Sequence, residues 1–267
     1  MAYQEHPYGW PTIGKEIRHI QEAKLSDVQE FYNKFYNPSN AILSISGPLP
    51  VDEVFELANK WFGHIPSGAL LSDVQTKEPQ QTKARYKRIT SDVPVRLFIG
   101  SCHMPGRVDK EYYACDLLSD ILANGKSSRF YKTLVREQKI MSTADCYLTG
   151  NFDAGLIIFE GRPVAGYTTE ECIDAIWNEA EKIKTEPPSE RELQKVKNKV
   201  IASITMNDLS VLNKAAALAY FEWLGALDDI NRQEEMYQRI STEEIVTVCS
   251  KYLKPSNASF LEYVPIA

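Results

Sequence analysis

Four histidines are the side chains of this sequence best suited to bind a metal or transfer a proton. They are His6, His19, His64 and His103. A catalytic zinc site on a helix needs two histidines about one turn apart, a carboxylate, and a coordination position left for water. No pair of these histidines has that spacing. The sequence therefore predicts no metal ligand and no catalytic residue in this chain, and the substrate-binding residues stay unknown.

Two of these histidines lie in segments whose backbone can be interpreted. The stretch from His6 to Gly14 reads HPYGWPTIG, in which prolines and glycines are typical of turns. We expect His6 to be structural or solvated, although it could also contact a substrate or a partner domain. His103-Met104-Pro105 is expected to end a strand in a turn.

Ser128 and Arg129 are a second pair that could do chemistry, as a nucleophile and an anion clamp. No histidine is placed by the sequence to activate the serine hydroxyl. We therefore expect Ser127 or Ser128 to cap a helix and Arg129 to reach a nearby carboxylate or carbonyl. Three lysines at alternating positions, Lys195, Lys197 and Lys199, are expected on a solvated helix face.

The cysteines and tryptophans are interpreted as structural residues. Five cysteines occur singly, with no CxxC pair, and Cys115, Cys146 and Cys172 fall on predicted helices or strands. We expect them to be small core residues rather than a disulfide framework or a zinc site. Trp177 and Trp223 are expected in a core or an interface.

Composition limits the classes of partner. The chain has 267 residues, a formal net charge of -6 and ordinary hydrophobic (43%) and charged (25%) fractions. This balance argues against nucleic acid or an anionic membrane as the main partner, and no apolar run is long enough to span a membrane. No secretory signal is visible. Unpaired cysteines favour the cytoplasm, whereas an export signal in a lost upstream region would favour the periplasm.

The stretch 111–162 must position any central site. Apolar residues at helical spacing from Tyr113 to Leu122 predict a helix that ends at Asn124-Gly125, and a second helix follows. From Ser142 the pattern alternates, which indicates a strand, and 150–155 reads as a hairpin connection. The apolar run 156–159 predicts a strand buried on both faces.

The remaining elements complete an α+β pattern. Ser26 with Gln29 predicts the start of an amphipathic helix that stops at Asn37-Pro38. Further strands are predicted at 41–46, 93–99 and 259–264, and further helices at 51–62, 168–186, 189–204, 209–227 and from 241 to Pro255. We expect a split β-α-β (ferredoxin-like) sandwich with a mostly antiparallel sheet and helices on one face.

An internal repeat suggests a duplicated domain. Lys34–Ala41 (KFYNPSNA) and Lys251–Ala258 (KYLKPSNA) share five of eight residues, each at a joint between a helix, a proline and a strand. Coincidence is the alternative, because such joints are common. If the repeat is real, 1–64 is the remnant of an incomplete first copy, 65–90 is a linker and 91–267 is the second domain. Such a remnant is expected to pack against the second domain or against a partner chain for its stability.

Three motifs carry a family resemblance over nearly the whole chain. HPYGWPTIG, KLSDVQEFYNKFYNPSNAILSISG and YYACDLLSDILANGKSSRFYKTLVREQKI occur in the family order. The chain resembles the pitrilysin/insulinase-like zinc metallopeptidases, and in particular an N-terminally truncated zinc-bearing half of a shorter bacterial member. The resemblance implies pairs of homologous α+β domains, which agrees with the repeat.

The resemblance also shows what this chain lacks. Family members bind zinc through His-x-x-Glu-His and a distant Glu, and that motif precedes the segment at which this chain begins. The family's Arg/Tyr pair, which holds the substrate oxyanion, aligns with Val135 and Ser142, and neither can do that work. The resemblance therefore implies zinc in the parent protein, none bound to this chain, and no catalytic residue to carry over.

The leading functional hypothesis is a part of a zinc-dependent endopeptidase that hydrolyses peptides in a closed chamber. This chain would supply scaffold and chamber wall, with a second peptidase half or homologous subunit as partner and peptides as substrate. The alternative is a non-catalytic binding or assembly subunit of the same fold. An unrelated ferredoxin-like enzyme would need its own cluster of titratable groups, for which the sequence has no motif.

Overall fold

The computed structural model describes residues 1–69 and 76–266, and it divides into two units. Unit 1 contains Met1–Gln4, Glu78–Ser203 and Arg232–Ala267. Unit 2 contains Glu5–Lys77 and Ile204–Asn231. Each unit is described by itself. Residues 70–75 of the expected linker lie outside the described residues.

A five-stranded sheet forms the centre of unit 1. Its strands are β1 (Arg85–Ser91), β2 (Leu97–Met104), β3 (Met141–Leu148), β4 (Gly155–Pro163) and β5 (Ala258–Pro265). They lie in the order β1-β5-β2-β4-β3, and among these neighbours only β1 and β5 run parallel. The predicted α+β class with a mostly antiparallel sheet is confirmed.

The burial of the strands follows their position in the sheet. On the edge strand β3, Ala144 and Cys146 are buried while Asp145 and Tyr147 are exposed, as the alternating pattern predicts. The inner strand β4 is buried along most of its length, which the apolar run 156–159 also predicts.

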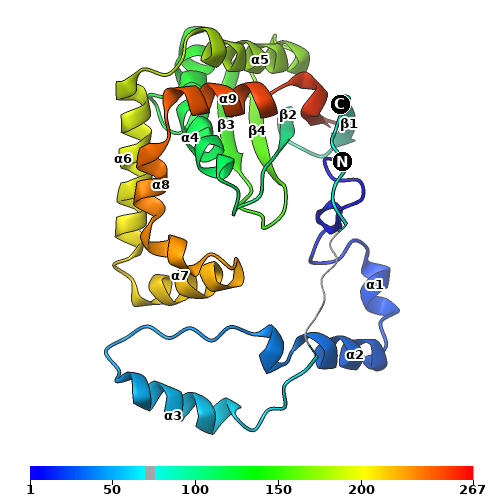
Figure 1. Cartoon of the computed structure of the whole chain (residues 1–267). Helices are drawn as coiled ribbons and strands as arrows, with labels where there is room; N and C mark the ends of the chain where they lie inside the picture. The colour runs from blue at the N-terminus through cyan, green and yellow to red at the C-terminus, as the bar shows by residue number, and fades with distance from the viewer. Residues whose placement is uncertain (70–75, 267) are drawn as a thin grey trace. The chain divides into compact units, whose positions relative to one another are not determined.

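Three helices cover one face of this sheet (Figure 1): α4 (Glu111–Ala123), α5 (Thr169–Thr185) and α9 (Thr242–Tyr252). Trp177 of α5 meets Phe159 of β4 and Phe260 of β5 edge-on, with ring centroids 6.1 and 6.0 Å apart. Such contacts are a favourable aromatic geometry, and they place Trp177 against the core, one of the two positions expected for it.

The remaining helices are divided between the two units. Unit 2 holds η1 (Pro7–Gly9), α1 (Ile17–Gln21), α2 (Leu25–Phe35), η2 (Pro38–Asn40), α3 (Val51–Phe62), α7 (Val211–Trp223) and η4 (Leu227–Asn231). Unit 1 adds η3 (Tyr131–Glu137), α8 (Gln233–Arg239) and η5 (Pro255–Asn257). Helix α6 (Glu190–Asn207) begins in unit 1 and ends in unit 2.

Two expectations about unit 1 are wrong. Residues 85–90 were assigned to the linker, but they form the edge strand β1, which pairs in parallel with β5. The partner strand β5 lies far away in the sequence, and the exposed face of β1 carries charged side chains. Residues 85–90 therefore show little alternation of apolar and polar residues. Helix α8 was not predicted. In unit 2, Trp223 is 57% exposed in this chain, so it is not a core residue here, and the interface position that was the other expectation for it stays a prediction.

Residues 41–46 differ from the prediction in unit 2. They were predicted to form a strand, yet the structure assigns no strand there, although Ala41 has extended backbone angles. A strand is defined by a hydrogen-bonded neighbour, and the described residues offer this segment none. The helix before it begins at Leu25 rather than after Ser26, and Lys24 occupies its N-cap.

Close packing of aromatic rings over glycines in the sheet generates a prediction. A Cβ atom at Gly161 would lie 2.4 Å from Cζ of Phe98 and 2.9 Å from Sδ of Met141, and both of those side chains are buried. Gly161→Ala should therefore lower the free energy of unfolding by about 1–3 kcal/mol, the usual effect of overpacking a core. Urea denaturation followed by circular dichroism would measure the change.

Gly150→Ala is the matched control. Its added Cβ would lie 3.6 Å from the hydroxyl of Tyr112, an ordinary contact, so the denaturation midpoint should stay close to that of the parent chain. Equal midpoints for both variants would contradict the packing described for β2 and β4.

Candidate functional site

The histidines of unit 2 do not build a metal site. His6 is 3% exposed, its Nδ1 accepts the N–H of Tyr8 at 3.1 Å, and it thereby caps η1. The structural role expected for His6 is confirmed. His19 and His64 are exposed.

His103 of unit 1 anchors the start of the chain. Its Nε2 donates to the carbonyl of Ala2 at 3.0 Å, and its ring stacks on Tyr3 at 5.2 Å. Burial lowers the pKa of its imidazole, against the opposing effect of that hydrogen bond. The residue lies within β2, opposite Leu156, so the turn expected at His103 begins only after Met104.

The described residues do not fit a bound zinc ion. Among residues 1–69 and 76–266, no group of three or more histidine, cysteine, aspartate or glutamate side chains could hold a metal. All five cysteines are buried and free, as expected of core residues. Burial raises the pKa of the Cys102 thiol to about 12, which disfavours the thiolate that zinc requires. No catalytic step can therefore be assigned to a metal held by these residues.

Arg129 has the role predicted for it, whereas Ser128 does not. Arg129 donates to both carboxylate oxygens of Glu192 at 3.2 and 3.1 Å and to the carbonyl of Glu186 at 3.1 Å, as expected. Ser128 is fully buried, and its hydroxyl has no hydrogen-bond partner among the described residues, so it is not a cap. The chain enters η3 through a turn, with Phe130 at the N-cap.

Lys197 differs from its predicted solvated position. It is buried, and its ammonium group donates to the carbonyl of Gln238 at 2.8 Å, near the C-terminal end of α8. Because α8 was not predicted, the sequence contained no sign of this partner. Lys195 and Lys199 are exposed, and Lys195 donates to the hydroxyl of Ser127 at 2.9 Å.

The two positions aligned with the family's Arg/Tyr pair carry neither an arginine nor a tyrosine. Val135 is half-buried in η3. Ser142 is exposed on β3, and its hydroxyl donates to the carbonyl of Arg162 at 3.3 Å. The assignment of these positions to the pair stays a prediction.

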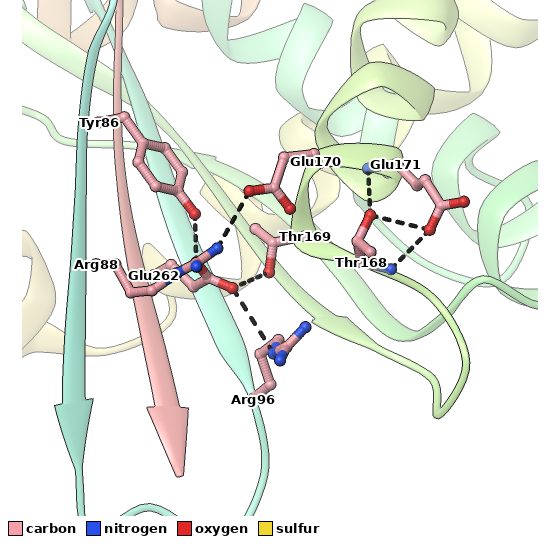
Figure 2. A network of polar contacts seen from close by, with 8 residues as sticks. All are labelled: Tyr86, Arg88, Arg96, Thr168, Thr169, Glu170, Glu171 and Glu262. Atoms are coloured by element: carbon pink, nitrogen blue, oxygen red, sulfur yellow. Dashed lines mark hydrogen bonds and ion pairs between the residues drawn. The ribbon is translucent and has the colours of Figure 1, made fainter. Parts of the chain in front are cut away.

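A buried carboxylate organises a polar cluster of unit 1 (Figure 2). Glu262 on β5 is fully buried, and it accepts hydrogen bonds from Tyr86 and Arg88 of β1. The hydroxyl of Thr169, the first residue of α5, donates to its other oxygen at 2.6 Å, and Arg96 lies 3.7 Å from that same oxygen. The carboxylate thus ties the edge strand, an inner strand and a helix together.

The electrostatics of Glu262 follow from these partners. Burial by itself raises the pKa of a carboxyl, but hydrogen bonds from Thr169, Tyr86 and Arg88 outweigh it, and the pKa of Glu262 is lowered. Burial and the neighbouring carboxylate together raise the pKa of Tyr86 to about 12. Arg88 also reaches Glu170 at 3.2 Å. In the sequence, the only sign of this cluster was the charged residue Glu262 within the otherwise largely apolar strand β5.

Unit 2 presents an apolar groove of about 810 Å³ beside α2 and α3. Its lining comes from both helices and from the segment after η2: Phe31, Tyr32, Phe35, Tyr36, Asn37, Pro38, Asn40, Ala41, Ile42, Leu43, Ala58, Phe62 and Ile65. Several of these side chains are more than half exposed in the chain. This surface, rather than a cluster of catalytic groups, is the notable feature of unit 2.

The fold and these sites describe an α+β domain without a metal-ligand group among its described residues. A profile of the family called the peptidase M16 inactive domain matches residues 23–200, which is more than half of the chain. The chain therefore belongs to this family, and the resemblance to pitrilysin/insulinase-like zinc peptidases is confirmed.

The chain is also similar to named relatives and solved structures. It is 26% identical over 265 residues to the zinc protease PqqE of Helicobacter pylori, covering 97% of this chain and 59% of that protein. A crystal structure of a protease from Helicobacter pylori aligns with a TM-score of 0.91 at 26% identity, over 99% of this chain and 64% of that one. The peptidase M16 inactive domain from Pseudomonas fluorescens shares the fold, with a TM-score of 0.84 at 18% identity over 99% and 63%. The chain spans less than two thirds of each of these proteins.

The Glu262 cluster generates a prediction about pH. Because the folded-state pKa of Glu262 is lowered, its stabilising effect is present above the unfolded pKa of about 4.3 and is lost as the pH falls through the folded value. Glu262→Gln should lower the free energy of unfolding near pH 7 by about 2 kcal/mol, since it removes a charged acceptor of buried hydrogen bonds. Thermal unfolding at pH 7 and below pH 4 would measure this difference.

Glu160→Gln is the control, because Glu160 is half-buried on β4 and its nearest ion-pair contact, to Arg162, is long at 3.8 Å. Its effect should be small at both pH values. A Glu262→Gln effect of equal size at pH 7 and below pH 4 would rule out the ionised carboxylate as the stabilising species.

Proposed function

We propose that this chain is the non-catalytic scaffold of a zinc-dependent endopeptidase. In the parent protein it would form part of the wall of a closed chamber in which peptide bonds are hydrolysed. The observation that carries the proposal is the match of residues 23–200 to the peptidase M16 inactive domain. It is supported by the similarity to a named zinc protease along 97% of the chain.

The zinc site belongs, in this proposal, to polypeptide that this sequence does not include. The described residues hold no metal-ligand group, and the chain spans only 59% of the length of the PqqE relative. Peptides are the proposed substrate, and a second peptidase half or a homologous subunit is the proposed partner. The family's general pattern of paired domains supports this division of labour.

We propose the cytoplasm as the compartment of this chain, and only the chemistry of its cysteines supports this. Five free, buried cysteines favour a reducing cytoplasm. None of the helices in the described ranges is both long enough and apolar enough to cross a lipid bilayer.

Peptide hydrolysis by two forms of the protein tests the proposal. The 267-residue chain should show no chelator-sensitive cleavage of a quenched fluorescent peptide library, with or without added zinc. The longest polypeptide encoded by its gene, alone or co-expressed with a neighbouring homologous subunit, should cleave the library and lose that activity on addition of a chelator. Restoration by zinc would identify the metal.

Each other outcome decides against the proposal. Robust cleavage by the 267-residue chain that a chelator abolishes would mean that a metal site lies within it. A longer gene product that stays inactive with its partner subunit would favour the alternative, a binding or assembly subunit of this fold.

A further inference from the structure

Residues 1–4 form a strap that side chains from distant parts of the sequence hold on unit 1. Nη1 of Arg85 donates to the carbonyls of Met1 and Ala2, at 2.9 and 2.8 Å. Nε2 of His103 donates to the same carbonyl of Ala2 at 3.0 Å. One backbone oxygen thus accepts hydrogen bonds from a guanidinium group and from an imidazole.

Tyr3 adds an aromatic contact to the same imidazole. Its ring stacks on that of His103, with the ring centroids 5.2 Å apart and the planes inclined by 26°. Its hydroxyl donates to the carbonyl of Ala154 at 2.8 Å and accepts from Nδ2 of Asn151 at 3.3 Å, in the connection between β3 and β4. The strap is therefore docked by stacking on His103 as well as by hydrogen bonds.

The strap docks on the face of the sheet opposite α4, α5 and α9. Trp177 of α5 packs against Phe260, whose ring lies 6.4 Å from that of Phe98 on β2, so Phe98 faces the helices. Side chains alternate between the two faces along a strand, so His103, an odd number of residues later, faces the other way. Its partner on β4, Leu156, shares that face and is 8% exposed. The strap on His103 therefore covers the end of this face at which Leu156 is buried.

The imidazole of His103 is the titratable group at the centre of these contacts. Burial lowers its pKa, its hydrogen bond to the strap and the carboxylate of Glu78 act against this, and the guanidinium of Arg85 lowers the pKa further. The strands beside it contribute neutral groups: Leu156 lies opposite it on β4, and Nδ2 of Asn257 donates to its carbonyl at 2.8 Å. A proton on the docked imidazole is therefore disfavoured.

We propose that the strap is an acid-released cover on the open face of the sheet. Protonation of His103 places a second cation beside Arg85 at the carbonyl of Ala2, and residues 1–4 then detach from unit 1. Detachment exposes Leu156 and the stacked face of the imidazole, which together form an apolar and aromatic surface. The proposal rests on contacts within unit 1 and does not depend on the proposed peptidase function.

The docked strap should be stable at neutral pH and should detach in mild acid. The pKa of His103 is lowered while the strap is docked, and it returns towards the ordinary histidine value of about 6.5 when the ring is exposed. Docking is therefore fully favoured above about pH 6.5, and it weakens as the pH falls from there towards the pKa of the docked imidazole. A strap whose docking weakens tenfold on protonation lowers the pKa of this imidazole by about 1.

A proton NMR titration tests the coupling between the strap and the imidazole. The Hε1 resonance of His103, assigned by its absence in His103→Gln, should titrate with a pKa below about 6.5 in the 267-residue chain. Tyr3→Ala removes the stacked ring and both contacts of its hydroxyl, so the pKa of His103 should rise towards about 6.5. Equal pKa values in the two proteins would overturn the proposal.

Hydrogen exchange of the Gln4 amide measures docking at a second point. This N–H donates to both carboxylate oxygens of Glu78, at 2.9 and 3.0 Å, and makes no bond to the imidazole. Relative to an unstructured peptide at the same pH, its exchange should be at least about 10-fold faster near pH 5 than near pH 7.5. The amides of 259–263 in β5 should stay protected at both pH values, which shows that the sheet remains folded.

Two histidine substitutions provide matched variants. His103→Gln keeps an N–H donor for the carbonyl of Ala2 but does not titrate, so the pH dependence of Gln4 exchange should disappear. His64→Gln removes an exposed histidine of unit 2 and should leave that dependence unchanged. Exchange that is equal at both pH values would contradict acid release. A pH dependence that survives in His103→Gln would assign the response to another group, such as Glu78, and would equally overturn the proposal.

Discussion

An inner strand of a sheet must have its backbone groups paired along both edges, and this requirement governs the whole chain. In unit 1 the last segment of the sequence meets it: β5 lies between β1, with which it runs parallel, and β2, with which it runs antiparallel. The sheet is therefore complete only when the C-terminal residues are in place. Residues 41–46 repeat this segment without any such neighbour in the described chain.

The same arrangement decides where charge can be buried. β5 brings Glu262 beneath the start of α5 and beside β1, where Thr169, Tyr86 and Arg88 supply the hydrogen bonds that a buried carboxylate needs. The corresponding position of the repeat is Ile45, which needs no such partners. The repeated segment is thus apolar at this position, and the Glu262 cluster is built from residues of unit 1.

The chain's membership of the peptidase M16 inactive domain family fits this division. Unit 1 supplies a sheet and helix layer in which ionisable groups such as Arg129 and Glu192 make structural contacts. Unit 2 supplies exposed apolar side chains around α2 and α3. The described residues thus offer a packed sheet-and-helix layer in unit 1 and an exposed apolar surface in unit 2.

The sequence by itself determined the elements whose signals are local. The helix at 111–123, the capping boxes at Thr168 and Ser241, and the apolar run of β4 were all predictable, because capping and periodicity act over a few residues. The family and the lack of its zinc motif were also readable from motifs in order along the chain.

Only the tertiary structure decided the features that depend on distant partners. β1 is a strand because β5, more than 160 residues later, pairs with it, and 41–46 is not a strand because no such partner is described. Lys197 is buried because α8 offers it a carbonyl, and Glu262 is buried because three elements converge on it. Pairing and desolvation are properties of neighbours in space, and one-dimensional spacing does not contain them.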